Sequence, residues 1–348
     1  MIRSLLLALL AVTVPTATPE LRDSPTAETV LRRTLDDTTE WSLSDLRQTL
    51  DGEPVDSGQV LGMEVVTVRS VELLDRTGEV AEGRAQRIER DVERADSTSD
   101  ITVESPLGAL DFTVDSESDL VGETVVFDWN AKDERYDRRL EDPSAADLSS
   151  LDVDAGLTRL LPRDEVAVGG RWTVAAEDFV AALCLGGDLG VLPGATPQIP
   201  GDGISGADLV AASCIHLGQP WDRTKGTVEL VWTETVEVDG RSMARIEVAG
   251  EVELTRDLTD HLERALAGSG ADSSSREDYE VEVDWEDLDV QGEIHWDLDR
   301  ERFAEGQLEV SGEAVLTVAW QDPFGWIEIE AELSTESTLE LRASQEEG

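Results

Sequence analysis

From residue 224 to the end of the chain, apolar and polar side chains alternate along one stretch after another. In residues 228–236, for example, Val228, Leu230 and Trp232 fall on one side. A period of two places successive side chains on opposite faces of a strand, so each stretch predicts a half-buried β-strand. Asp239 and Gly240 follow, and both residue types tolerate the positive φ of a tight hairpin turn. Short, turn-rich connections of this kind predict an antiparallel meander rather than a βαβ repeat.

The same reasoning predicts strands in both halves of the chain, at 29–35, 63–74, 85–94, 100–103, 123–128, 244–254, 279–285, 290–298, 303–320 and 326–341. The stretch 85–94 also suits a helix face. The acidic, serine-containing residues 115–120 and 142–151 predict loops. We therefore expect a mostly β protein: a large curved antiparallel sheet or open half-barrel of long meandering strands. A few short helices accompany it, at 176–185, 207–215 and 258–266.

The chain begins with a predicted signal peptide, residues 1–17. Arg3 supplies its positive charge and residues 5–12 its apolar core. That core is shorter than the roughly 20 residues that cross a bilayer, and no later segment is apolar enough to do so. The leader predicts a secreted or periplasmic protein that does not span the membrane. The mature chain divides into a β-rich region at 18–156, a Gly- and Pro-rich insert at 157–223 and a β meander at 224–348. The alternative is one continuous domain over 18–348.

The mature protein is strongly acidic. The sequence holds 77 acidic and 28 basic residues, a formal net charge of −49. Nucleic acids and anionic membrane surfaces attract clustered Lys and Arg, so this charge excludes both as electrostatic partners. The acidity fits a saline habitat, binding of divalent cations, or solvated faces that drifted towards acid, and the sequence leaves these open.

The insert contains both cysteines of the chain, Cys184 and Cys214. An even number of cysteines in an exported protein favours a disulfide, which we predict between them. The alternative is a reactive thiol beside His216.

No motif for catalysis, a metal or a cofactor appears in its required context. Residues 201–206 spell G-x-G-x-x-G, but the preceding residues read as a loop rather than the buried strand that a phosphate-binding turn needs. His216, His261 and His295 show no metal-ligand spacing. A calcium-like loop opening at Asp287 has Leu298 where a bidentate Glu is required. We therefore expect no catalytic residue, no metal site, no cofactor and no enzymatic activity.

Tryptophan is the aromatic residue that invites a functional interpretation. Four tryptophans fall on the predicted C-terminal strands: Trp285, Trp296, Trp320 and Trp326. If they share a face, they line either an ordinary core or an apolar groove suited to a lipid or another hydrophobic ligand. Core packing is the favoured reading of the two.

Two short motifs carry a resemblance. The first runs from Leu160-Leu161-Pro162 through residues 166–174, a valine-x-valine-glycine-x-x-tryptophan pattern. The second is residues 292–298 followed by Arg302 and Phe303. This arrangement resembles uncharacterised secreted bacterial proteins built of long antiparallel strands. The resemblance implies the β-rich fold and export, and it implies no activity.

Three functions remain in contention. The first is an exported, non-enzymatic carrier or binding module of the cell envelope for a lipid or hydrophobic ligand. The second is an acidic surface or interaction protein, and the third an unrecognised hydrolase. A cavity lined by Trp and Leu favours the carrier, and a filled core with acidic outer faces favours the interaction protein. The sequence does not indicate an oligomeric state.

Overall fold

The computed structural model of the chain describes residues 21, 25–55, 62–105, 108–141, 148–154, 157–193, 221–259, 280–322 and 325–346. The N-terminal elements are β1 (Val30–Leu50), β2 (Glu53–Val55), β3 (Gly62–Thr77), β4 (Val80–Ala81), β5 (Arg84–Ala85), β6 (Arg87–Ser105), β7 (Gly108–Ser118), β8 (Thr124–Asn130) and β9 (Arg135–Leu140). The insert holds the 3-10 helix η1 (Thr158–Leu160), β10 (Arg171–Ala175), α1 (Ala176–Leu183) and β11 (Val191–Pro193). The C-terminal strands are β12 (Arg223–Val238), β13 (Arg241–Asp257), β14 (Glu280–Asp297), β15 (Arg302–Asp322) and β16 (Gly325–Gln345).

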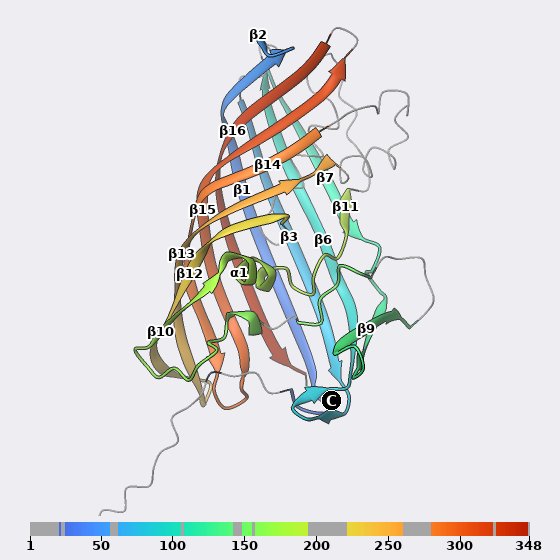
Figure 1. The fold of residues 1–348 in the computed structure, drawn as a ribbon, viewed down its shortest axis with the longest axis vertical. Helices are drawn as coiled ribbons and strands as arrows, with labels where there is room; N and C mark the ends of the chain where they lie inside the picture. The colour runs from blue at the N-terminus through green and yellow to red at the C-terminus, as the bar shows by residue number, and fades with distance from the viewer. Residues whose placement is uncertain are drawn as a thin grey trace, which may run out of the picture.

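One 14-stranded sheet dominates the molecule (Figure 1). Its main path runs β10-β12-β13-β14-β15-β16-β1-β3-β6-β7-β11. The strands of this path pair antiparallel, and the last strand of the chain, β16, pairs with the first, β1, along nearly its whole length. The N-terminal and C-terminal meanders therefore form one surface, which ends at β10 and β11 without closing.

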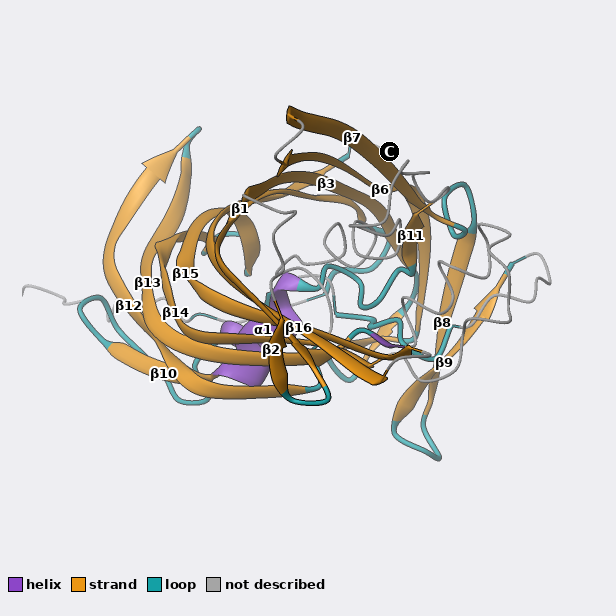
Figure 2. Cartoon of the chain, turned by 90° about the horizontal axis from the view of Figure 1, so that it is seen from above, coloured by secondary structure: helices purple, strands orange, loops and turns teal. Residues whose placement is uncertain are grey.

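The sheet curls around α1 and the loops that follow it (Figure 2). Register shifts interrupt several pairings, including β12 with β13 and β14 with β15. Bulges of this kind bend a strand and increase its twist. Away from this shift, glycine permits a close approach of β12 to β13: a Cβ on Gly226, where φ is +100°, would lie 2.3 Å from the Glu251 carbonyl oxygen. The curled sheet has a concave face towards α1 and a convex face towards solvent.

The buried core lies against the concave face. Alternate residues of each long strand point inward, as in β14, where Val281, Val283 and Trp285 are at most 1% exposed. Helix α1 adds Phe179 and Leu183 to the same cluster. Acidic residues in the first turn of α1 suit the positive end of the helix dipole. No helix among the described residues is long and apolar enough to cross a membrane.

The predicted fold class is confirmed: a mostly β protein with one large, curved, open antiparallel sheet. The ambiguous stretch 85–94 is strand rather than helix, and the helix predicted at 176–185 is α1. The helix predicted at 207–215, and that at 258–266 beyond residue 259, lie outside the described residues. The loop predicted at 115–120 is wrong for its first four residues, which belong to β7. The physical reason is a polar concave surface, described below.

Candidate functional site

The tryptophans selected from the sequence do not form one continuous surface. Trp285 and Trp296 are each 1% exposed on the concave face of β14, but eleven residues, or roughly 35 Å of extended strand, separate them. Trp320 of β15 is partly buried against the core. Trp326 of β16 lies out of phase with the inward-facing residues of its strand, which include Leu333. Three of the four therefore share the concave face, at different heights.

Of the two cysteines predicted to form a disulfide, the structure describes only Cys184. Cys184 follows α1 and is 6% exposed, and burial raises the pKa of its thiol to about 12. Cys214 and His216 lie outside the described residues. The disulfide between Cys184 and Cys214 therefore stays a prediction.

The upper end of the concave face is apolar and partly open. We define the upper end as that of the β6–β7 and β15–β16 hairpins, nearest β2 in Figure 1. Several side chains here pack on the core without being fully buried, and Leu110 of the edge strand β7 is 45% exposed. Leu110 is in register with Val103, which is 1% exposed, so both face inward. We call this set the upper apolar surface: Leu43, Leu46, Met63, Leu110, Phe112 and Trp320.

Below it, the concave face turns polar across five neighbouring strands. Strand register aligns these residues in rows, because Cα partners on paired strands point to the same face. One row joins Asp37, Arg69, Ser97 and Ser116, and the next joins Ser337, Thr39, Thr67 and Ser99. We call the set the polar belt: Asp37, Thr39, Thr67, Arg69, Ser97, Ser99, Ser116, Ser118, Thr335 and Ser337. Every member is at most 8% exposed.

Hydroxyl groups of the belt bond to one another and to the backbone. Thr39 Oγ1 lies 2.7 Å from Ser337 Oγ, and Thr67 Oγ1 lies 2.9 Å from Ser99 Oγ. Ser118 donates to the Leu189 carbonyl, which fixes the segment after α1 against β7. Buried hydroxyls are stable when they are paired in this way. Most of the belt is therefore ordinary, well-satisfied polar structure.

Arg69 is a member of the belt that is not satisfied in this way. It is 3% exposed, and its Nε and Nη1 have no hydrogen-bond partner. Burial lowers the pKa of its guanidinium, and the negative charges of Asp37 and Asp188 oppose that shift. A buried charged donor without a partner costs stability, since it has left water and gained nothing in exchange. The belt thus holds a buried cation whose Nε and Nη1 donors are not engaged by the protein.

A second buried arginine shares the concave face, nearer the lower end. Arg90 of β6 is 1% exposed and pairs with Asp75 of β3 through two contacts, Nε–Oδ1 at 2.7 Å and Nη2–Oδ2 at 3.0 Å. It also donates to the carbonyls of Asp152, at 2.6 Å, and Val153, at 2.9 Å. Phe127 lies under the guanidinium, 5.0 Å from Cζ to the ring centroid. This arginine is fully engaged and holds the 148–154 segment against the sheet.

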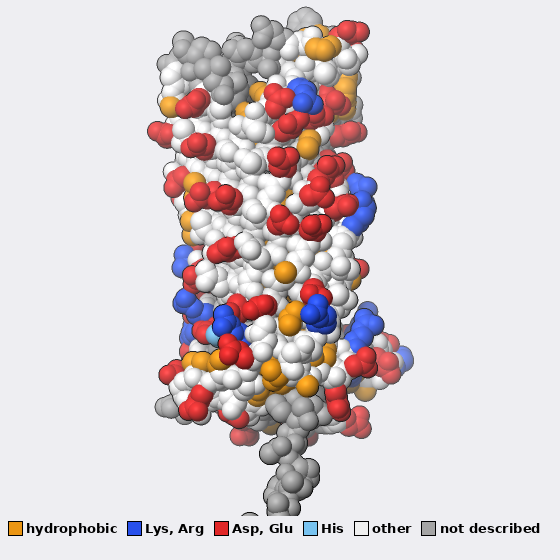
Figure 3. All heavy atoms as spheres, turned by 90° about the vertical axis from the view of Figure 1, so that its left-hand side faces the viewer, with side chains coloured by type: hydrophobic (Ala, Val, Ile, Leu, Met, Phe, Trp, Pro, Cys, Tyr) orange, Lys and Arg blue, Asp and Glu red, His pale blue; other side chains and the backbone are white. Residues whose placement is uncertain are grey.

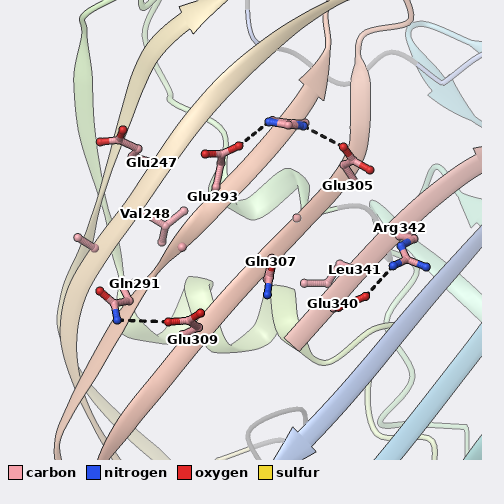
Figure 4. A pocket seen from close by; sticks show the side chains of 14 residues that line it. Glu247, Val248, Gln291, Glu293, Glu305, Gln307, Glu309, Glu340, Leu341 and Arg342 are labelled. Atoms are coloured by element: carbon pink, nitrogen blue, oxygen red, sulfur yellow. Dashed lines mark hydrogen bonds and ion pairs between the residues drawn. The ribbon is translucent and has the colours of Figure 1, made fainter. Parts of the chain in front are cut away.

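The convex face carries a shallow depression of about 700 Å³ over β13 to β16 (Figure 4). Several of its polar groups have partners within the depression or at its rim. His295 lies 2.6 Å from Glu293 and 3.0 Å from Glu305, and Arg245 lies 2.5 Å from Glu293. Acidic side chains are spread along this outer surface (Figure 3). Among the described residues, no group of three or more His, Cys, Asp or Glu side chains could hold a metal ion.

The chain matches no protein-family model and no curated protein. Among solved structures, it is similar to an outer membrane channel of Pseudomonas putida F1, at 7% identity with a TM-score of 0.22, covering 93% of this chain and 98% of that one. It is also similar to a FadL homologue of Pseudomonas aeruginosa, at 6% identity with a TM-score of 0.14, covering 91% and 90%. TM-scores this low carry no argument about this chain.

Proposed function

We propose that this chain is an exported, non-enzymatic protein of the cell envelope that binds a hydrophobic ligand on its concave face. The observation that carries the proposal is the upper apolar surface, where Leu110 is 45% exposed on an inward-facing position. Apolar side chains on the inside of a curved sheet suit an apolar ligand, because burial of their surface drives binding. The predicted leader supports export.

One observation favours the second candidate, an acidic interaction protein. The lower concave face is filled, with Trp232 and Trp296 each at most 1% exposed, and acids are spread over the outer face. A partner of this kind would bind the convex surface rather than the concave one. A hydrolase has less support, because the described His295 contacts carboxylates of its own face rather than a serine.

Two exposed apolar residues on opposite faces make a matched test. Leu110 faces inward and is 45% exposed, while Val68 of β3 faces outward and is 47% exposed. The purified mature protein is titrated with N-phenyl-1-naphthylamine, a neutral apolar fluorophore. We expect Leu110→Asp to weaken binding by about tenfold, the equivalent of losing one buried leucine, and Val68→Asp to leave it unchanged.

Absence of saturable fluorophore binding would contradict the proposal. Equal losses in Leu110→Asp and Val68→Asp would contradict it too, since a charge on the convex face should not reach the ligand. Retained binding in both variants would move the site away from the upper apolar surface.

A further inference from the structure

Arg69 has hydrogen-bond donors that the rest of the polar belt does not satisfy. The described hydroxyls at its centre are paired with one another, as in Thr39 with Ser337 and Thr67 with Ser99. Arg69 stands in the same rows with two nitrogen atoms that have no acceptor, although it is 3% exposed. Guanidinium groups are donors only, so the missing partner must present acceptor atoms.

We propose that Arg69 receives the carboxylate headgroup of an amphiphilic ligand whose apolar chain lies along the upper apolar surface. This inference rests on the proposed function and names the class of ligand that it takes. Carboxylates are the acceptors that arginine pairs with most favourably in a buried site, through short charge-assisted hydrogen bonds.

The placement of the two surfaces fits one extended amphiphile. Arg69 of the belt and Met63 of the upper apolar surface lie six positions apart on the same strand, β3, which is roughly 20 Å. Val65 continues the inward face between them and is 1% exposed. A chain anchored at Arg69 and running up the strand passes Thr67 and Val65, each 1% exposed in the ligand-free protein, so the ligand must displace what covers them before it reaches Met63.

The charges around Arg69 favour a singly charged headgroup. Asp37 and Asp188 lie close enough to act on the Arg69 guanidinium. With acids already present, a phosphate monoester, which carries about −1.5 to −2 charges, would meet stronger repulsion than a carboxylate. A neutral hydroxyl headgroup would accept only a weaker hydrogen bond from Arg69 than a carboxylate accepts. The site is therefore specific for a monoanion.

The test compares three probes of the same chain length: palmitate, hexadecanol and hexadecyl phosphate. Each displaces N-phenyl-1-naphthylamine from wild type, Arg69→Met and Arg69→Lys. We expect wild type to bind palmitate at least about tenfold more tightly than hexadecanol, the value of a charge-assisted hydrogen bond. Arg69→Met should lose that preference and still bind hexadecanol. Arg69→Lys, which keeps the charge without the planar fork, should retain part of it. Arg94→Met serves as the control, since Arg94 is a solvent-exposed arginine on β6.

Each alternative outcome overturns a definite part of the account. Equal wild-type affinities for palmitate and hexadecanol would refute the headgroup assignment and leave the proposed function standing. Tighter binding of hexadecyl phosphate than of palmitate would refute the carboxylate. An undiminished palmitate preference in Arg69→Met would place the headgroup elsewhere. Failure of all three probes to bind would refute both the inference and the proposed function. Should Arg69→Met not fold, Arg69→Lys carries the comparison.

Discussion

Two buried arginines on the same concave face differ in how their hydrogen-bonding capacity is used. Arg90 is held by the Asp75 carboxylate, two carbonyls and an aromatic ring. Arg69, on the neighbouring strand and a comparable 3% exposed, leaves Nε and Nη1 without a partner. The first arrangement explains how a loop is fastened to a sheet. The second has no such structural explanation, and buried donors that a fold does not use are typical of binding surfaces.

The largest effect should follow from removing the satisfied arginine. Arg90→Met leaves Asp75 buried with only Arg33 as a partner and frees two carbonyls. We expect a loss of about 3–5 kcal/mol in the free energy of unfolding, measured by chemical denaturation. Arg94→Met, which removes an exposed pair with Asp96, should change it by less than about 1 kcal/mol. Similar losses in the two variants would remove the basis for calling Arg90 structural.

The pH dependence of stability gives a second test of the structural role of Arg90. Burial alone would raise the pKa of Asp75, but Arg90 and Arg33 outweigh it and lower that pKa below its ordinary value. A carboxyl whose pKa is lowered on folding contributes stability above its unfolded pKa of about 3.9, and this contribution is lost as pH falls through the folded value. Wild type should therefore lose more stability than Arg90→Met between pH 5 and pH 2. An equal loss in both proteins would contradict the assignment.

Paired double variants compare the two arginines directly. In Asp37→Asn with Arg69→Met, the ligand-free protein should be as stable as wild type or more stable, by up to about 1–4 kcal/mol, because a poorly satisfied buried charge has gone. In Asp75→Asn with Arg90→Met, stability should fall, since Arg33 and the Asp152 and Val153 carbonyls lose their partners. Urea denaturation of both measures this difference. Two equal losses would mean that Arg69 is a structural residue too.

The smallest effect concerns the outer face. Acids there are spread along strands and are not gathered into a metal-binding group within the described residues. Added NaCl should raise the melting temperature gradually by screening their repulsion. Calcium at matched ionic strength should add nothing further. A rise of several degrees that is specific to Ca²⁺ would make cation binding the better explanation of the acidity.

The sheet could be predicted from the sequence because most of its strands alternate apolar and polar residues. Val228, Leu230 and Trp232 face the core as their spacing indicates. The sequence predicted a curved sheet but not its strand order. The β1–β16 pairing that joins the two meanders depends on contacts between residues distant in the sequence. No local sequence pattern predicts which distant strands will pair.

Three errors of the sequence prediction fall at the polar belt. The predicted strand 29–35 stops just before Asp37, although β1 continues to Leu50. Residues 95–99, with Ser97 and Ser99, separate two predicted strands that are one strand, β6. The loop predicted at 115–120 begins in β7, where Ser116 and Ser118 face inward. In each case polar residues occupy inward-facing positions, and they interrupt the alternation of apolar and polar residues on which the prediction depends.

These coincident errors carry information about the site. Sequence rules assume that inward-facing residues are apolar, and they fail where a protein keeps polar groups inside for another purpose. A search for alternation of hydroxyl groups with other polar residues would have found the belt. It would not have singled out Arg69, whose lack of partners depends on strand register and on what packs over it.

The most direct measurement is the ionisation of a bound headgroup. Palmitate labelled with ¹³C at the carboxyl carbon reports its own protonation by NMR as pH is lowered. A nearby guanidinium favours the ionised form, while Asp37 and Asp188 oppose it equally in wild type and in Arg69→Met. We predict that the carboxylate bound to wild type stays ionised to a lower pH than the carboxylate bound to Arg69→Met. Identical titrations of the labelled carboxyl in the two proteins would contradict it.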